Sequence, residues 1–107
     1  MSDHRKTKVE ESIAHMAMDF FARESAVKAL ITVTHAQVGQ TFKNVTVYFT
    51  VLPVSMEAQA LKFAKRSRTD FRAYVKKNSY LHPIPVVDFA IDLGEKNRQR
   101  IDELTRS

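Results

Sequence analysis

Residues 44–52 read Asn44-Val-Thr-Val-Tyr-Phe-Thr-Val-Leu52, and apolar and polar side chains alternate strictly along them. A period of two is typical of a β-strand with one buried face. The preceding stretch, Ala29 to Val38, is rich in β-branched residues, and Gly39 to Thr41 provides a short connection. The sequence therefore predicts an antiparallel hairpin, whose second strand ends at Pro53 because proline cannot donate to a strand ladder.

A helix is predicted ahead of the hairpin. Apolar residues recur at helical spacing from Lys8 to Ala22. Thr7 and Glu10 have the spacing of a capping box, which would start the helix. Residues 1–6 are polar, and we expect them to be frayed.

Two short helices are predicted after the hairpin. Ser55 is the expected N-cap of the first. The helical pattern breaks at Ser67-Arg68-Thr69-Asp70, which resembles a second capping box and predicts a new helix there. We expect Asn78 to end that helix in a left-handed turn.

The remaining chain completes one domain over residues 1–107. Pro83 and Pro85 keep the chain extended before a predicted strand, Val86 to Asp92. A loosely packed tail helix is expected over residues 93–107, with Asp92 and Glu95 as its capping box. A crossover through two helices favours a last strand parallel to the second. The predicted fold class is α+β: a three-stranded mixed sheet packed against one helical layer, with a short C-terminal helix.

Composition excludes several classes of protein. The 107 residues include no cysteine, which excludes disulfides and thiolate metal sites, and only two glycines, which argues against a Gly-rich phosphate loop. No apolar run is long enough to span a bilayer, and no signal-peptide pattern is present. We therefore expect a cytoplasmic protein that contacts no membrane. We also expect it to act as a monomer.

The main charge feature lies between residues 62 and 77. This window holds seven cations against one carboxylate, and so carries +6 in a chain of net charge +5. Arg68, Arg72 and Lys76 follow at spacings of four, where like charges repel on a helix. A solvated helix surface is the bland explanation. The repulsion favours instead a polyanionic partner that neutralises the cations.

Aromatic residues near this window suggest a second type of contact. The helical spacing places Phe63 and Phe71 on the core side. Tyr74 or Tyr80 could stack on bases, which is how many proteins recognise single-stranded RNA. Thr46 and Tyr48 face away from the apolar stripe of the hairpin, so the open sheet face could also bind a ligand.

The sequence shows no catalytic or metal-binding arrangement. Four histidines are scattered along it, namely His4, His15, His35 and His82. No two of them have metal-ligand spacing on a well-defined element. Asp88 and Asp92 share a strand face, but without a cleft or a base they are a weak sign of catalysis. We expect a protein that is not an enzyme and uses no cofactor, metal or small-molecule substrate.

Six short segments, taken in order, resemble those of a known family. They are Ile31 to Thr34, Val45 to Leu52, Phe71-Arg72, Pro85 with Phe89, Asp92, and Arg100 to Leu104. This set is similar to the bacterial ribosome-binding factor A family. The resemblance implies a KH-like (type II) αββααβ domain. It also implies a non-catalytic assembly factor that binds the small (30S) ribosomal subunit and 16S rRNA during rRNA processing and maturation.

Three family features differ in this chain. The family usually has Asp-Pro-Arg before the first strand, where this chain has a shorter connection, Glu24 to Lys28. The family has an Ala-x-Gly kink between the two central helices, where this chain has Arg68-Thr69-Asp70. The family has an Arg-rich stretch before the last strand, where this chain has Tyr80-Leu81-His82-Pro83. The resemblance therefore marks a divergent member.

Together, charge and resemblance predict RNA binding through phosphate contacts. The predicted contacts are Lys62, Lys65, Arg66, Arg68, Arg72, Lys76 and Lys77, with Arg100 from the tail helix. One alternative is a protein-interaction module that uses the open sheet face or the apolar Phe20-Phe21 helix end. Another is a general KH-like nucleic-acid-binding domain with no tie to ribosomes. Protein association would survive high salt, whereas RNA binding would weaken steeply.

Overall fold

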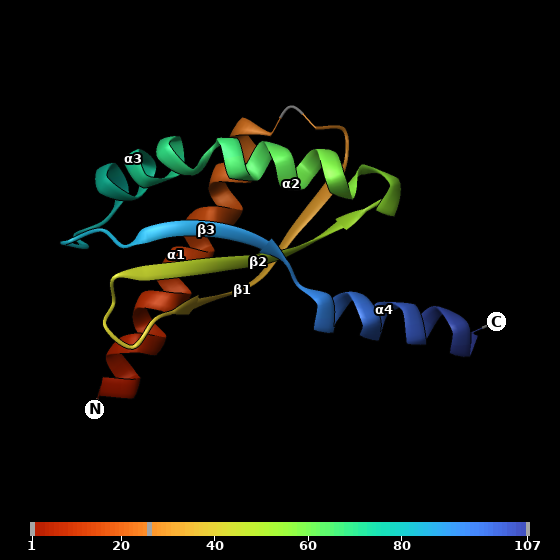
Figure 1. Cartoon of the computed structure of the whole chain (residues 1–107), viewed down its shortest axis with the longest axis horizontal. Helices are drawn as coiled ribbons and strands as arrows, with labels where there is room; N and C mark the ends of the chain where they lie inside the picture. The colour runs from red at the N-terminus through yellow and green to blue at the C-terminus, as the bar shows by residue number, and fades with distance from the viewer. Residues whose placement is uncertain (1, 26, 107) are drawn as a thin grey trace.

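The computed structural model describes residues 2–25 and 27–106, and the side chains of residues 4–25 and 27–101. Its elements are α1 (Ser2–Glu24), β1 (Leu30–Val38), β2 (Asn44–Leu52), the 3-10 turn η1 (Val54–Met56), α2 (Glu57–Arg66), α3 (Arg68–Asn78), β3 (Val86–Ile91) and α4 (Leu93–Arg106) (Figure 1). The predicted α+β class and element order are confirmed.

The three strands form one mixed sheet in the order β1-β2-β3. β1 pairs antiparallel with β2, from Leu30 opposite Leu52 to Val38 opposite Val45, so the predicted hairpin is confirmed. β3 runs parallel to β2, which confirms the orientation predicted from the two-helix crossover. The register of β1 shifts between Val33 and His35, where a β-bulge interrupts the ladder.

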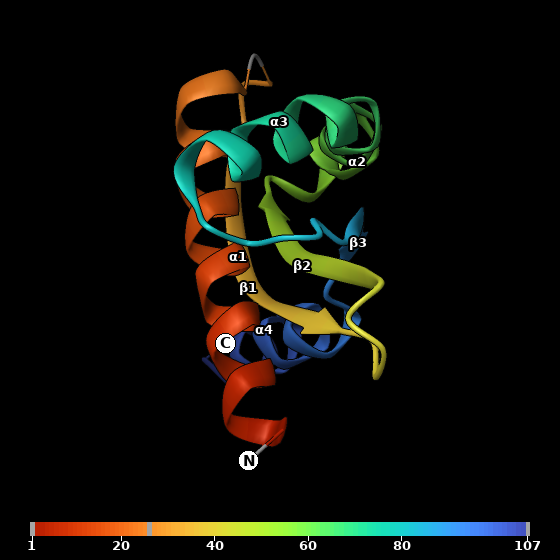
Figure 2. The same ribbon diagram turned by 90° about the vertical axis from the view of Figure 1, so that its left-hand side faces the viewer.

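Helices α1, α2 and α3 cover one face of the sheet. Four alternating residues of β2 point into the core, and each is 3% exposed or less: Val45, Val47, Phe49 and Val51. Aromatic rings join the layers, because the Phe21 ring of α1 lies 5.9 Å from Phe49 and 5.2 Å from Phe89. Figure 2 shows α1 alongside β1, with α2 and α3 running across the end of the molecule. The predicted single helical layer is confirmed.

The first helix starts earlier than its capping signal indicated. α1 begins at Ser2, so Thr7 lies inside the helix and the predicted capping box of Thr7 and Glu10 is wrong. The Glu10 carboxylate instead accepts a hydrogen bond from the backbone N–H of Val38 at 2.8 Å. Glu10 therefore ties α1 to the end of β1.

Two further predicted helix boundaries differ from the structure. Ser55 lies within η1, and α2 begins after Met56 without a side-chain cap. Asn78 does not adopt a left-handed turn. Its amide donates back to the carbonyl of Tyr74 at 2.9 Å, and the chain leaves α3 through Ser79 in extended backbone. A backbone bond from Met56 to Pro53 precedes α2, and the side chains of Asn78 and Ser79 bond to backbone carbonyls at the end of α3.

Asp92 starts α4 as predicted, since its Oδ1 accepts the backbone N–H of Glu95 at 2.9 Å. The reciprocal bond of the capping box, from the Asp92 N–H to the Glu95 carboxylate, is absent. The Glu95 carboxylate instead accepts a hydrogen bond from Arg98 Nε at 2.9 Å. The second oxygen of Asp92 accepts the Thr34 hydroxyl at 2.6 Å. From this anchor α4 projects away from the sheet, with Ile101 62% exposed (Figure 1).

Candidate nucleic-acid interface

α2 and α3 are separated by one residue, Ser67, which is only 7% exposed. Its backbone N–H donates to the carbonyls of Phe63 and Ala64, both at 3.0 Å. Its hydroxyl donates back to the Phe63 carbonyl at 2.8 Å, so the predicted capping box of Ser67 with Asp70 is wrong. The predicted break in the helix is nevertheless present, and the last cation of α2, Arg66, and the first of α3, Arg68, flank Ser67.

Alternating burial separates an apolar and a cationic side of these two helices. The buried residues are Ala60, Ala64, Phe71 and Val75. Seven of the eight predicted contacts lie on α2 and α3, and the exposed ones are Lys62, Arg66, Arg68, Arg72, Lys76 and Lys77. Lys65 is half-buried. The helices therefore hold a cationic surface, here called the α2–α3 surface and consisting of these seven residues.

One carboxylate, Asp88 on β3, reaches two of these cations. Lys65 Nζ lies 2.9 Å and Arg68 Nη1 3.5 Å from Asp88 Oδ1. Burial alone raises the pKa of Asp88. Hydrogen bonds from Lys65 and the Phe89 amide, with the charges of Lys65 and Arg68, lower this pKa overall. Sequence reasoning missed this contact, because nothing in the spacing shows that the two side chains reach the edge strand.

Arg72 makes a different contact. Its Nη2 donates to the carbonyl of Ile84 at 3.1 Å, which ties the loop before β3 to α3. None of the ion pairs found among the described residues involves Lys62, Arg66, Lys76 or Lys77. These four cations therefore keep their charge available to a ligand.

Arg100 lies apart from the α2–α3 surface. It is exposed on α4, the helix that projects from the sheet (Figure 1). It lines a hollow together with Leu52, Val54 and Glu57. One turn earlier on α4, Lys96 Nζ pairs with Glu57 at 3.0 Å. The structure therefore does not bring the eighth predicted contact together with the other seven.

The aromatic residues near the cations differ in exposure. Phe71 is buried and Phe63 half-buried, as predicted. Tyr74 is half-buried, with its ring 5.8 Å from Phe20 in an edge-on arrangement. Tyr80 is fully exposed. Of the two tyrosines considered for base stacking, only Tyr80 leaves both ring faces accessible.

The alternative protein-binding surfaces are less open than the sequence suggested. Phe20 and Phe21 are each 4% exposed, so the prediction of an apolar helix end available to a partner is wrong. On the open sheet face, the Tyr48 ring stacks on His35 at 4.7 Å. His35 in turn lies 3.3 Å from Asp92. This face is therefore already partly occupied by its own side chains.

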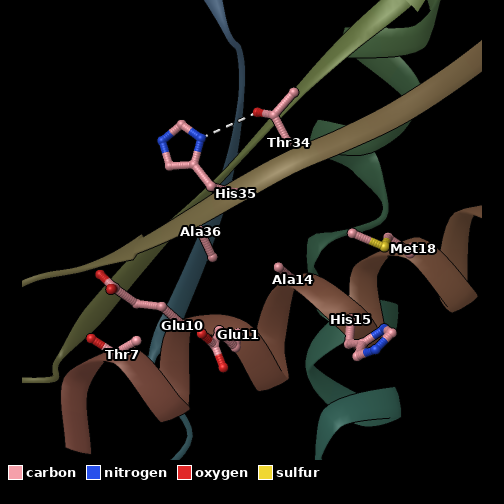
Figure 3. Close-up of a pocket in the computed structure, with 9 residues that line it drawn as sticks. All are labelled: Thr7, Glu10, Glu11, Ala14, His15, Met18, Thr34, His35 and Ala36. Carbon is pink, nitrogen blue, oxygen red and sulfur yellow. Dashed lines mark hydrogen bonds between the residues drawn. The ribbon is translucent and has the colours of Figure 1, made fainter. Parts of the chain in front are cut away.

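A second hollow lies between α1 and β1 (Figure 3). It has a volume of about 560 Å³, and its walls include Glu10, Glu11, His15, Thr34 and His35. The two carboxylates there would repel a phosphate backbone. Within residues 2–25 and 27–106, no three His, Asp or Glu side chains come together as metal ligands. The hollow is therefore a weaker candidate for nucleic acid than the α2–α3 surface.

No helix in the described part of the chain combines the length and apolar character needed to cross a membrane.

Known proteins match this chain in fold and over nearly its whole length. Residues 5–105 match the family described as "Ribosome-binding factor A". A ribosome-binding factor A from Hydrogenovibrio crunogenus is 27% identical over 106 residues, covering 94% of this chain and 88% of that protein.

Two solved structures share the architecture. The crystal structure of ribosome-binding factor A from Thermus thermophilus matches with a TM-score of 0.70 at 20% identity, over 80% of this chain and 93% of that one. The solution structure of a Thermotoga maritima candidate for the same factor matches with a TM-score of 0.68 at 21% identity, over 80% and 85% of the two chains. These likenesses support the KH-like fold.

Proposed function

Because the chain belongs to the ribosome-binding factor A family, we propose that it is a non-catalytic assembly factor that binds the small (30S) ribosomal subunit and 16S rRNA during rRNA processing and maturation. The family match over residues 5–105 supports the assignment to ribosome assembly. The cationic α2–α3 surface supports RNA as the bound component of the subunit.

The residues of the α2–α3 surface have distinct proposed roles. Lys62, Arg66, Lys76 and Lys77 contact phosphates directly, since no ion pair among the described residues engages them. Lys65 and Arg68 share Asp88 in the free protein and turn to phosphate when RNA approaches. Arg72 positions the loop before β3 and adds its charge. Arg100 makes a separate contact from α4.

Salt dependence follows from this arrangement. Each phosphate of single-stranded RNA that the protein neutralises releases counterions. The logarithm of the binding constant should therefore fall with the logarithm of the salt concentration, with a slope of roughly −0.7 per contact. We propose further that the protein acts as a monomer in the cytoplasm, where it needs neither a cofactor nor a small-molecule substrate.

The test is co-sedimentation with isolated 30S subunits on sucrose gradients at low and high salt. Arg66→Glu and Lys76→Glu should each weaken binding and flatten its salt dependence. Arg68 and Arg72 are less suitable sites, because both make internal bonds that a reversal would break. Lys8→Glu is the matched control, since it makes the same charge change at an exposed position on α1.

The outcomes separate the alternatives. Equal binding by Arg66→Glu, Lys76→Glu and the wild type would reject the α2–α3 surface as the contact. Association that survives high salt would favour a protein partner. Salt-sensitive binding of any RNA, with no preference for the subunit, would favour a general KH-like binder.

A further inference from the structure

The loop before β3 and the β1–β2 turn lie at the same end of the molecule, on the left in Figure 1. Residues of both segments line a pocket there. Its volume is about 780 Å³, within the range of roughly 300–1,000 Å³ of sites that hold small organic groups. Backbone bonding joins its two walls, because the N–H of Val86 donates to the carbonyl of Lys43 at 2.9 Å. The pocket is therefore a fixed part of the fold.

Aromatic and cationic groups line this pocket together. The rings are Phe42, Tyr80 and His82, and the permanent cations are Arg5 and Lys43. None of its described lining residues is acidic. The Arg5 guanidinium lies over the Phe42 ring, 5.4 Å from its centroid. Ion pairs among the described residues involve neither cation. The site therefore combines π-faces with uncompensated positive charge.

Tyr80 has no evident structural role. It is fully exposed, although a tyrosine ring normally buries a large apolar area. Its neighbours fix the backbone beneath it, since the Leu81 N–H donates to Ser79 Oγ at 3.3 Å and Ser79 Oγ donates to the Val75 carbonyl at 2.7 Å. The ring thus stands on an ordered loop with both faces free.

The backbone of Phe42 also points to a fixed site. Phe42 is the one described non-glycine residue with a positive φ, at 59°. This left-handed conformation is uncommon for a bulky side chain and persists where the surroundings hold it. This backbone position carries the ring that lies beneath the Arg5 guanidinium.

The pocket also continues the α2–α3 surface. Lys76 and Lys77 lie in the last turn of α3, directly before the loop that carries Tyr80. Arg72 binds that loop through the Ile84 carbonyl. An RNA strand whose phosphates follow α3 would therefore reach the aromatic pocket next.

We propose that this pocket holds an unstacked base of single-stranded RNA, with the Tyr80 ring against the base and Arg5 and Lys43 against the adjoining phosphates. The inference rests on the proposed function and adds a base contact to its phosphate contacts. Stacking on an aromatic ring suits single-stranded RNA because every base has a π-face. Two uncompensated cations and no acidic group among the described lining residues favour a polyanion over a protein partner.

The test compares two probes of equal charge. One is a short single-stranded oligoribonucleotide of mixed sequence, and the other is the abasic ribose-phosphate chain of the same length. Tyr80→Ala should weaken binding of the first about 5- to 100-fold and leave binding of the second unchanged. Tyr80→Phe keeps the ring and should restore binding. Leu30→Ala, at an exposed apolar position at the far end of β1, is the control.

Salt titrations test the cations separately. Arg5→Gln and Lys43→Gln should each reduce the salt slope by roughly 0.7 for both probes, whereas Tyr80→Ala should leave the slope unchanged. An equal loss for both probes in Tyr80→Ala, or no loss for either, would overturn base stacking. Weaker 30S binding by Tyr80→Ala with unchanged oligoribonucleotide binding would assign the pocket to a ribosomal protein and also overturn it.

This test can fail independently of the proposed function. If Arg66→Glu releases the subunit while Tyr80→Ala binds the oligoribonucleotide like the wild type, only the base pocket is rejected. If Tyr80→Ala behaves as expected while Arg66→Glu and Lys76→Glu leave subunit binding unchanged, the α2–α3 contact is rejected and the pocket stands.

Discussion

Lys65 on α2 and Asp88 on β3 form an ion pair with a distance of 2.9 Å between Nζ and Oδ1. Asp88 also lies 3.5 Å from Arg68, so one carboxylate partly neutralises two cations beside the α2–α3 joint. Asp88→Asn should therefore release positive charge, tighten binding to 30S subunits and steepen its salt dependence. Because the side chains are about half exposed, the loss of stability should be about 0–1 kcal/mol.

Asp70→Asn is the control for this prediction. It removes the one carboxylate within the basic window, from an exposed position that forms no ion pair with the described residues. The two variants have equal net charge, so co-sedimentation should show a larger gain for Asp88→Asn. Equal gains would mean that only overall charge matters and that the Lys65 contact is irrelevant to binding.

Asp92 anchors α4 through both of its oxygens, one to the Glu95 N–H and the other to the Thr34 hydroxyl. Asp92→Ala should remove the cap at a cost of about 0.5–2 kcal/mol. Asp92→Asn retains a capping oxygen and should lose less. Urea denaturation measures the total loss of stability. Hydrogen exchange should show faster exchange of the backbone amides along α4, with those of β2 still protected. Equal exchange along α4 in Asp92→Ala and the wild type would contradict this anchoring role.

Low pH should weaken the anchoring of α4 by Asp92. The pKa of Asp92 is lowered by the hydrogen bonds from the Glu95 amide and Thr34, which outweigh the opposite effect of burial. Its contribution to stability is therefore present above the ordinary value of 3.8 and is lost as the pH falls through the lowered pKa. Circular dichroism across this range should show an acid-induced loss of stability that is smaller in Asp92→Asn.

Phe21 connects α1 to the sheet, with ring contacts to Phe49, Phe63 and Phe89 at 5.9, 6.2 and 5.2 Å. Phe21→Ala should cost about 3–5 kcal/mol, because it leaves a cavity among packed rings. Met18→Ala changes an exposed residue of the same helix, 43% accessible, and should cost much less. Urea denaturation compares the two. Similar losses would mean that the aromatic cluster does not dominate the core.

The sequence predicted the sheet well because the alternation of apolar and polar residues directly reflects which face of a strand is buried. Strict alternation in residues 44–52 corresponds to the inward-facing side chains of β2, and Pro53 ends that strand as expected. The parallel partner, Val86 to Ile91, followed from the two-helix crossover. Helix ends were predicted less well. Thr7, Ser55 and Asn78 have capping chemistry, but none of them acts as the expected cap. α1 begins at Ser2, Ser55 lies within η1, and Asn78 bonds back to Tyr74.

The candidate site was predicted only in part. The spacing within residues 62–77 indicated a cationic helical surface, because like charges lie together on the same two helices. The Asp88 contact and the Arg72–Ile84 bond join segments distant in sequence, so local patterns could not show them. Nor could composition distinguish Tyr74, which packs edge-on against Phe20, from the fully exposed Tyr80.

Glu10 provides a final test of how α1 is held to the sheet. Its carboxylate accepts the N–H of Val38, a residue only 1% exposed, at 2.8 Å. Glu10→Ala leaves that buried donor unpaired and should cost about 1–3 kcal/mol. Glu10→Gln retains an acceptor and should lose less stability. Glu11→Ala alters an exposed neighbour and should lose the least stability. If urea denaturation gave the same stability for Glu10→Ala and Glu11→Ala, solvent would be satisfying the Val38 N–H, and the contact would not hold α1 in place.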